Sequence, residues 1–435
     1  MGARETALNV LLTCRKEGGW SNGVLKAYTA RDRLDSRDSA LAARLCYGVL
    51  QNRNCLDHYL AQLLKGKIKD LHPAVRDILH LGLYQIYFMD KIPESAAVNE
   101  AVELTKKYCR KQYSAPGLVN GVLRNAVRTK GSLKEPISWE DKYSHPGELI
   151  NLLKAYVGKE RLEGMLQANN TVAPMTVQTN IRRISTDALR ERLKAEGVTY
   201  EQHPWLADCL VLSGTGDLEK LPSFREGLFY VQDAAAKLSV LCADIQPGQQ
   251  VLDCCAAPGG KSFAAAMQTE SVIISCDVYP HKVELIAKGA KRLGMENIVP
   301  MQQDATAFRP EWENRFDTVI TDVPCSGLGI IRKKPDIRYK ELSSIAELPA
   351  LQRKILDNAA RYVRPGGLLL YSTCTLVRAE NEGMVENFLQ THHDFTTEPL
   401  PLGTPFPKNE SGMLTLVPGE YDTDGFFICR LRRKL

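Results

Sequence analysis

The stretch VLDCCAAPGGKS, residues 251–262, joins a short apolar run to a turn of small residues and then to an apolar helical pattern. An apolar run of this length is typical of a buried strand. Glycines in the turn let a ligand approach the backbone closely, and the first N–H groups of the following helix have no helical partner and attract anions. This strand–turn–helix unit predicts the start of an α/β domain with a ligand site at the turn.

Further apolar runs follow this unit, with helical patterns between them. The expected strands cover residues 251–253, 272–276, 298–301, 318–320 and 368–371. Strands alternating with helices are typical of a mostly parallel, doubly wound sheet. Two later runs, residues 413–416 and 426–429, predict an antiparallel hairpin at the edge of that sheet. Residues 231–435 are therefore expected to form an α/β, Rossmann-like domain.

The chain before this domain has a different pattern. Residues 3–130 place apolar side chains three and four positions apart, with no strand pattern between them. Residues 131–230 mix helical patterns with alternating strands at 175–180 and 209–212. The sequence thus predicts a multidomain protein with an all-α domain at residues 1–130, a small α+β linking module at 131–230 and the α/β domain at 231–435.

The bulk composition restricts the class of protein. A chain of 435 residues is too long for one hydrophobic core, which agrees with several domains. With 44% apolar and 25% charged residues, its composition is that of a soluble globular protein. No apolar stretch reaches the roughly 18 residues that span a bilayer, and the N-terminus has no signal-peptide pattern. We expect a cytoplasmic monomer without a membrane partner.

Twelve cysteines are scattered through the chain. In a large chain without a secretion signal, reduced thiols are expected instead of disulfides. No two cysteines have the C-x-x-C spacing of a zinc site, and only Cys254 and Cys255 are close neighbours. The sequence therefore predicts no bound metal.

Charge is distributed unevenly along the chain. Residues 1–130 hold 21 Lys and Arg against 12 Asp and Glu, a net charge of +9, whereas the other residues hold 35 against 39, a net charge of −4. A basic domain attached to a near-neutral one predicts a polyanion partner for the basic domain. The alternative is a basic surface that contacts only solvent.

Acidic residues end successive strands of the expected α/β domain. Asp277 follows the second strand, Asp304 the third and Asp322 the fourth. A carboxylate after the second strand suits a ribose diol, and one after the third can hold an adenine amino group. These acids favour an adenosine-containing ligand. Gly260-Lys261-Ser262 matches the end of a phosphate-binding loop, but the glycine that such a loop requires five residues earlier is Cys255.

Two cysteines follow expected buried strands directly. Cys325 lies in DVPCSG, residues 322–327, and Cys374 lies in STCT, residues 372–375. Side chains at the carboxyl ends of parallel strands face the crevice where α/β enzymes bind ligands. With Asp322 three residues before Cys325, this set can supply a nucleophile, an acid and a base. The alternative for each cysteine is a small buried hydrophobic side chain.

Three runs together resemble the Sun/NOP family of S-adenosylmethionine-dependent RNA (cytosine-5)-methyltransferases: DCCAAPGGK (253–261), DVPCSG (322–327) and YSTCT (371–375). The runs GLFYVQDA (227–234) and DTDGFF (422–427) resemble further segments of that family, and the order of parts is similar to the bacterial 16S ribosomal RNA enzymes of the RsmB type. PESAAVNEAV (93–102) and LVNGVLR (118–124) resemble the NusB-like RNA-binding domain. The resemblance covers nearly the whole chain.

This resemblance implies transfer of a methyl group from S-adenosylmethionine to carbon 5 of a cytosine in 16S ribosomal RNA, through a covalent adduct between a cysteine and carbon 6. It implies Cys374 as the nucleophile, Asp322 as the partner of the base at N3, and Cys325 in product release. Because DNA cytosine methyltransferases use the thiol of a Pro-Cys pair, the residues alone leave open which thiol attacks. The residues expected to bind S-adenosylmethionine are Cys255, Ala256, Ala257, Pro258, Gly259, Gly260, Lys261, Asp277, Asp304 and Asp322.

The segment IRKKPDIRYK, residues 331–340, carries five Lys and Arg and one aromatic side chain. We expect these cations to hold the phosphates of a flipped-out or single-stranded nucleotide; the alternative is a solvated loop. Two other functions stay open on the residues alone. One is a nucleotide hydrolase built on Gly260-Lys261-Ser262, and the other is a non-catalytic RNA adaptor that uses the basic helices.

Overall fold

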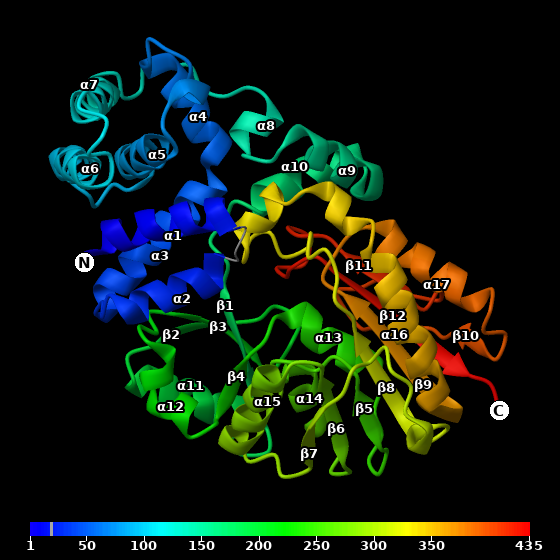
Figure 1. Ribbon diagram of the computed structural model, residues 1–435. Helices are drawn as coiled ribbons and strands as arrows, with labels where there is room; N and C mark the ends of the chain where they lie inside the picture. Colours follow the sequence, from blue (N-terminus) through cyan, green and yellow to red (C-terminus); the bar gives the residue numbers. More distant parts are fainter. Residues whose placement is uncertain (18–20) are drawn as a thin grey trace. The chain divides into compact units, whose positions relative to one another are not determined.

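The computed structural model describes residues 1–17 and 21–435, which divide into two units (Figure 1). One unit contains residues 1–154, 166–171 and 331–340, and the other contains residues 155–165, 172–330 and 341–435. The short segment 331–340 therefore belongs to the unit of the N-terminal helices. Within the described residues, no helix combines the length and the apolar composition that crossing a membrane requires.

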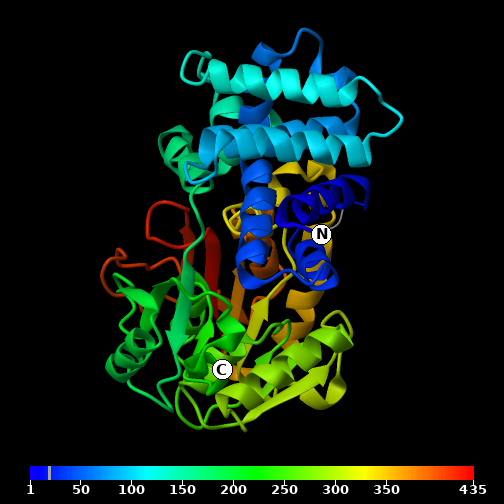
Figure 2. The same ribbon diagram turned by 90° about the vertical axis from the view of Figure 1, so that its left-hand side faces the viewer.

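The N-terminal part of the first unit is helical, as predicted. Apolar residues at three- and four-residue spacing turn one side of each helix toward a common core, and α5 is buried along most of its length. Figure 2 shows α6 and α7, drawn in light blue and cyan, side by side. The long helices are α1 (Ala3–Glu17), α2 (Ser21–Arg31), α3 (Ser36–Gln51), α4 (Arg53–Leu63), α5 (Pro73–Phe88), α6 (Glu94–Tyr108) and α7 (Ala115–Arg128). Shorter elements of this unit are η1 (Ile68–Asp70), α8 (Trp139–Lys142) and, later in the chain, η4 (Pro335–Tyr339). Helices α9 (Gly147–Val157) and α10 (Lys159–Ala168) are divided between the two units.

A four-stranded antiparallel sheet opens the second unit, in the order β2-β3-β1-β4. Its strands are β1 (Met175–Thr179), β2 (Thr199–Gln202), β3 (Cys209–Ser213) and β4 (Phe229–Val231). Helices α11 (Thr186–Ala195) and α12 (Pro222–Arg225) accompany it, with η2 (Leu218–Lys220) between β3 and α12. The expected strands at 175–180 and 209–212 are confirmed. Neither β2 nor β4 was predicted from the sequence. Three of the four residues of β2 are exposed, and β4 has only three residues, so neither strand gives a pattern long enough to recognise.

The large sheet has the order β10-β12-β9-β8-β5-β6-β7, and β11 also pairs with β12. From β9 to β7 all neighbours are parallel, as predicted, whereas β12 is antiparallel to β9, β10 and β11. The strands are β5 (Val251–Asp253), β6 (Ile273–Asp277), β7 (Ile298–Gln302), β8 (Phe316–Asp322), β9 (Val363–Thr373), β10 (Phe395–Thr397), β11 (Met413–Leu416) and β12 (Phe426–Arg433).

Both faces of the large sheet are covered by helices (Figure 1). Successive strand residues point to opposite faces, so Val251 joins one core and Leu252 the other. One core contains α13 (Ala234–Cys242), α14 (Gly260–Ala266) and α15 (Pro280–Leu293), and the other contains α16 (Leu348–Tyr362) and α17 (Glu382–Leu389). Short turns η3 (Pro310–Trp312), η5 (Leu342–Ile345) and η6 (Arg378–Glu380) connect these elements. This is the doubly wound arrangement that the strand–helix alternation predicts.

The predicted C-terminal hairpin is confirmed: β11 and β12 pair antiparallel at one edge of the sheet. Its second strand, β12, is an inner strand that also pairs with β9 and β10. The physical reason is burial: Phe426 to Leu431 are all buried, so the backbone of β12 needs hydrogen-bond partners on both of its edges.

Candidate active site

The two cysteines singled out in the sequence meet at the carboxyl edge of the large sheet. β8 and β9 are parallel neighbours, and their register places Asp322 opposite Ser372. Cys325 and Cys374 follow the ends of these strands, and their Sγ atoms lie 3.2 Å apart. Both side chains are partly exposed, so a substrate can reach them. Strand pairing therefore brings together two thiols that are 49 residues apart in the chain.

Asp322 joins the thiol pair to the glycine-rich turn. Its Oδ1 accepts a hydrogen bond from the Ser372 hydroxyl at 3.0 Å, and its Oδ2 lies 2.7 Å from the Lys261 ammonium. Lys261 is buried and also lies over the ring of Phe426, with Nζ 4.9 Å from the ring centroid. A third of the Asp322 side chain remains exposed. Lys261 is thus fixed against a carboxylate and an aromatic face in the α/β domain.

Contact between the sulfur atoms affects the ionisation of Cys325. The hydrogen bond with Cys374, followed by burial, raises the pKa of the Cys325 thiol well above its usual value. Two thiolates 3.2 Å apart would repel each other strongly, so the pair holds at most one negative charge. Either sulfur atom can be the donor of this hydrogen bond, and the raised pKa of Cys325 favours Cys325 as the protonated partner.

The turn after β5 has the backbone that its sequence predicts. Gly259 has φ 112°, a left-handed conformation that glycine adopts without strain, and α14 begins at Gly260. Of the predicted ligand residues in this turn, Ala256 and Gly259 are buried, Cys255, Ala257 and Gly260 are partly buried, and Pro258 is exposed. Burial raises the pKa of the Cys255 thiol well above its usual value, which disfavours the reactive thiolate form.

A buried acid that sequence reasoning did not select lies under this turn. Asp253 is fully buried, and its Oδ2 accepts a hydrogen bond from Ser262 at 2.7 Å; the Ser262 oxygen lies 2.8 Å from that of Ser275. Burial raises the pKa of the Asp253 carboxyl to about 7. The chain of hydroxyls ties the ends of β5 and β6 to the start of α14.

Asp277 and Asp304 lie at the ends of neighbouring strands. The last residue pair of the β6–β7 ladder is Asp277 with Gln302, and the N–H of Gln303 donates to the Asp277 carbonyl at 3.1 Å. The Asp277 side chain is buried, whereas Asp304 is exposed and accepts bonds from the N–H and hydroxyl of Thr306. The acids therefore line the same edge as the turn, but neither makes a direct contact with the Cys325–Cys374–Asp322–Lys261 cluster.

Three buried polar residues beside the thiols were also missed: Gln352, Glu380 and Asn381. Each of them bonds to the loops that carry Cys325 or Cys374. The only sequence signal is the polar pair Glu380-Asn381 between two apolar runs, six and seven residues after Cys374. That signal resembles an ordinary helix start, so the hydrogen-bond partners were needed to recognise it.

The prediction for the basic segment 331–340 is wrong for Arg338. This side chain is 1% exposed and donates to the carbonyl oxygens of Gln51, Ser144 and Asn169 within the first unit. A guanidinium with five N–H donors satisfies several buried carbonyl groups at once, which explains its position. Arg338 is a structural residue and is not available to phosphates.

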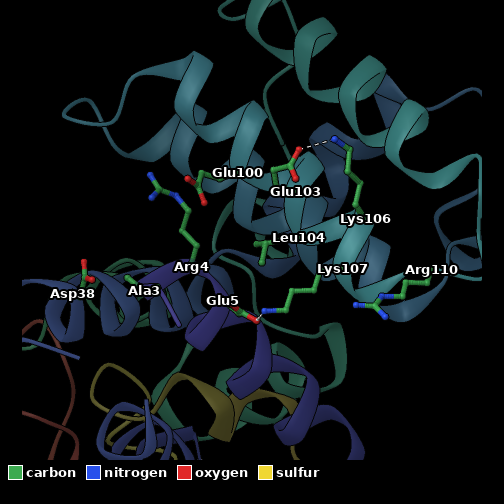
Figure 3. Close-up of a pocket in the computed structure, with 11 residues that line it drawn as sticks. Ala3, Arg4, Glu5, Asp38, Glu100, Glu103, Leu104, Lys106, Lys107 and Arg110 are labelled. Atoms are coloured by element: carbon green, nitrogen blue, oxygen red, sulfur yellow. Dashed lines mark hydrogen bonds and ion pairs between the residues drawn. The ribbon is translucent and has the colours of Figure 1, made fainter. Parts of the chain in front are cut away.

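The first unit contains a pocket of about 590 Å³ between α1 and α6 (Figure 3). Its charged side chains are four cations and four acids, and Figure 3 shows ion pairs between Lys106 and Glu103 and between Lys107 and Glu5. Opposite charges in equal number give no preference for an anion. Among the described residues, no three His, Cys, Asp or Glu side chains gather in the way that metal ligands do.

Comparisons with known proteins agree with this architecture along the whole chain. Residues 240–432 match the family described as 16S rRNA methyltransferase RsmB/F, residues 1–128 match the NusB family, and residues 145–219 match the ferredoxin-like domain of RsmF/B-like methyltransferases. These matches confirm the predicted fold classes: a NusB-like helical domain, a small α+β module of the ferredoxin-like type and an α/β methyltransferase domain.

Two solved structures share the fold. PH0851 superposes with a TM-score of 0.80 at 24% identity, over 100% of this chain and 99% of its own. NSun6 from Pyrococcus horikoshii, solved with SFG, superposes with a TM-score of 0.59 at 22% identity, over 66% of this chain and 98% of its own.

The relationship extends to function through a curated relative. The probable ribosomal RNA small subunit methyltransferase B of Bacillus subtilis (strain 168) is 34% identical over 99% of this chain and 98% of its own length. Its counterpart in Vibrio cholerae is 33% identical over 100% and 98%. Identity of this size over both full lengths shows that the chain belongs to the ribosomal RNA small subunit methyltransferase B family, of the RsmB/F type, and is a methyltransferase of small-subunit ribosomal RNA.

Proposed function

We propose that this enzyme methylates carbon 5 of a cytosine in 16S ribosomal RNA through a transient bond between Cys374 Sγ and carbon 6 of the base. The observation that supports this most directly is the 3.2 Å contact between Cys374 and Cys325, beside Asp322 at the ends of paired strands. Carbon 5 of cytosine is a poor nucleophile. Addition of a thiolate at carbon 6 turns it into an enamine-like carbon that can attack an electrophilic methyl group.

Asp322 is the partner of N3, where negative charge develops when the thiolate adds. A proton or hydrogen bond at N3 stabilises that charge. The Lys261 ammonium contacts Asp322 Oδ2 at 2.7 Å, so Lys261 can donate a proton to this carboxylate when Asp322 transfers one to N3. The Ser372 hydroxyl on Oδ1 fixes the orientation of the carboxyl group.

Cys325 is the group that removes the carbon 5 proton, so that Cys374 can leave. In the resting enzyme the pKa of the Cys325 thiol is raised first by its hydrogen bond with Cys374. Once Cys374 is bonded to the base, that sulfur carries no negative charge and attracts the S–H less strongly. The Cys325 thiol then ionises more easily and becomes a base at the stage where one is needed.

S-adenosylmethionine is the methyl donor that the site fits best, since its sulfonium supplies an electrophilic methyl group. The residues that would hold it are the turn Cys255–Lys261 and the strand-end acids Asp277 and Asp304. Three observations support the fit: the left-handed turn at Gly259, the buried carboxylate of Asp277 and the position of both acids at the carboxyl edge of parallel strands. The fold relative NSun6 was solved with SFG, an analogue of this donor.

The partner of the first unit is the same RNA. Residues 104–134 contain eight Lys and Arg and no Asp or Glu, and this run covers the end of α6, the following turn and all of α7. Arg110, Lys111 and Arg124 are exposed within it, as is Tyr113, whose side chain is 95% exposed. Cations with an exposed aromatic ring suit phosphates and an unpaired base. The alternative of a non-catalytic RNA adaptor is disfavoured, because such a protein does not need the thiol pair.

The test is methyl transfer from labelled S-adenosylmethionine to 16S ribosomal RNA, followed by bisulfite sequencing to locate the product. Wild-type protein should produce 5-methylcytosine, and Cys374→Ala should produce none. Full activity of Cys374→Ala would assign the attack to Cys325, and methylation at another atom would overturn the proposal. Hydrolysis of a nucleoside triphosphate in place of methyl transfer would favour the hydrolase alternative on Gly260-Lys261-Ser262.

A further inference from the structure

Two consecutive residues, Glu380 and Asn381, hold the loops of both cysteines. They lie at the end of η6 and the start of α17, and both side chains are 0% exposed. The hydroxyl of Tyr371 on β9 donates to the carbonyl oxygen of Glu380 at 2.6 Å. This bond anchors the dipeptide to the strand that leads to Cys374.

Glu380 brackets Cys325 with the help of Gln352. Glu380 Oε2 accepts hydrogen bonds from the N–H of Ser326 at 2.9 Å and from Gln352 Nε2 at 2.8 Å. Gln352 Nε2 also donates to the carbonyl oxygen of Pro324 at 2.9 Å. The residues before and after Cys325 are therefore both tied to this pair of side chains.

Asn381 brackets Cys374 in the same way. Its Oδ1 accepts from the Thr373 hydroxyl at 2.6 Å, and its Nδ2 donates to the carbonyl oxygen of Thr375 at 3.0 Å. The hydroxyls of Ser326 and Thr375 lie 2.6 Å apart and join the two brackets. The residues on both sides of each cysteine are thus held by hydrogen bonds, which we call the bracket of that cysteine. Both brackets depend on the dipeptide Glu380-Asn381.

Stability alone does not explain this choice of residues. Among the described residues no cation forms an ion pair with Glu380, and its Oε1 is buried without a hydrogen-bond partner. A buried carboxylate without a cation is unfavourable compared with an apolar side chain of similar volume. The need to hold the Cys325 loop in place is the simpler explanation for Glu380, because a single carboxylate oxygen can accept hydrogen bonds from two N–H groups.

We propose that Glu380 and Asn381 are positioning residues that set the separation of the two sulfur atoms, Glu380 by placing Cys325 and Asn381 by placing Cys374. This inference rests on the proposed function, in which Cys374 attacks and Cys325 allows release. Loss of the Asn381 contacts should then impair the attack on the base, and loss of the Glu380 contacts should impair product release. Displacement of a reacting atom by about 1 Å lowers a rate by about a hundredfold.

The experiment measures methyl incorporation, the covalent protein–RNA adduct on a denaturing gel, and the melting temperature, for full-length variants with 16S ribosomal RNA. Glu380→Ala should lower turnover by about a hundredfold while the adduct accumulates, because release fails. Asn381→Ala should lower turnover by about as much while the adduct disappears, because attack fails. Glu380→Gln, which keeps an acceptor oxygen for Ser326 and Gln352, should restore most of the turnover.

The matched control is Glu386→Ala, an exposed acid on α17 that pairs only with Arg378, which should behave as wild type. Equal changes of the adduct in Glu380→Ala and Asn381→Ala, in the same direction, would overturn the positioning roles. A wild-type enzyme that forms no 5-methylcytosine would instead overturn the proposed function, so the two failures are distinguishable.

A second measurement tests the separation of the two sulfur atoms without RNA. Phenylarsine oxide bridges two thiols only when their sulfur atoms are close. Intact-mass spectrometry should therefore detect its adduct on wild-type protein and one fewer adduct on Cys325→Ala, in which Cys254 and Cys255 remain as neighbouring thiols. Glu380→Ala and Asn381→Ala should bind the arsenical more weakly than Glu386→Ala does. Unchanged binding in both variants would show that the dipeptide does not set the sulfur separation.

Discussion

Gly329 and Gly425 meet backbone to backbone beside the loop that carries Cys374. The N–H of Gly425 donates to the Gly329 carbonyl at 2.8 Å, and the N–H of Gly329 donates to the Cys374 carbonyl at 2.9 Å. A Cβ atom on Gly329 would overlap the carbonyl oxygen of Gly425, and one on Gly425 would lie 2.6 Å from the Gly329 Cα. The C-terminal run DTDGFF therefore reaches the active site through a contact that only glycines permit.

Gly425→Ala is expected to push the Gly329 segment away from Cys374. Overpacking of this kind destabilises a protein by about 1–3 kcal/mol. Displacement of the Cys374 loop should lower methyl incorporation by more than the loss of folded protein explains. Gly403→Ala is the control, since no atom lies within 4 Å of a Cβ there. Normal turnover by Gly425→Ala would show that the loop tolerates the shift.

Cys325→Ala is expected to trap the protein–RNA adduct. The substitution leaves Cys374 free to attack the base but removes the proposed acceptor of the carbon 5 proton. Electrophoresis under denaturing conditions should show a slower band that requires both RNA and S-adenosylmethionine. Clean turnover by this variant would remove the release role from Cys325.

The reactivity of Cys325 should depend on Cys374. The hydrogen bond with Cys374 is the first cause of the raised pKa of Cys325, and burial is the second. In Cys374→Ala the first cause is absent, so the pKa of Cys325 falls and its alkylation by iodoacetamide begins at lower pH. Peptide mass spectrometry across a pH series measures this shift, with Cys429, a fully buried thiol, as an internal reference. An unchanged pH profile would contradict the proposed coupling.

Asp253 should make the enzyme less stable as the pH rises. Its folded pKa of about 7 lies above the ordinary 3.8, so between these values the folded state keeps a proton that the unfolded state has lost. The free energy of unfolding therefore decreases across that range, by about 4 kcal/mol at most. Asp253→Asn should match wild type near pH 4 and exceed it at pH 8 in urea unfolding. Parallel pH curves for the two proteins would contradict this assignment.

Arg338→Met should loosen the first unit. The substitution removes the Arg338 donors from the carbonyl groups of Gln51 and Asn169, and it leaves the Ser144 carbonyl with only the Tyr339 hydroxyl at 3.4 Å. Each buried carbonyl group that loses its partner costs about 1–3 kcal/mol. Hydrogen exchange of the full chain should speed up around residues 143–144 and 331–340. The exposed Arg124→Met, as control, should leave these segments protected.

Much of the candidate site could be predicted because its residues lie at strand ends. Once Val251–Asp253, Phe316–Asp322 and Val363–Thr373 are recognised as parallel strands, geometry alone brings Asp322, Cys325 and Cys374 to one edge. The brackets around the cysteines were not predictable in this way. Gln352 comes from a helix on one face of the sheet and Glu380 from a turn after β9, and no local pattern links them.

The sequence by itself determined the class of each domain, the strand that carries each reactive residue and the family to which the chain belongs, because periodicity and short motifs depend on neighbours in the chain. Only the tertiary structure decided that Arg338 is buried, that β12 lies inside the sheet and that Lys261 contacts Asp322. These features depend on which buried donors and acceptors find partners from distant segments. A linear pattern of polar and apolar residues does not contain that information.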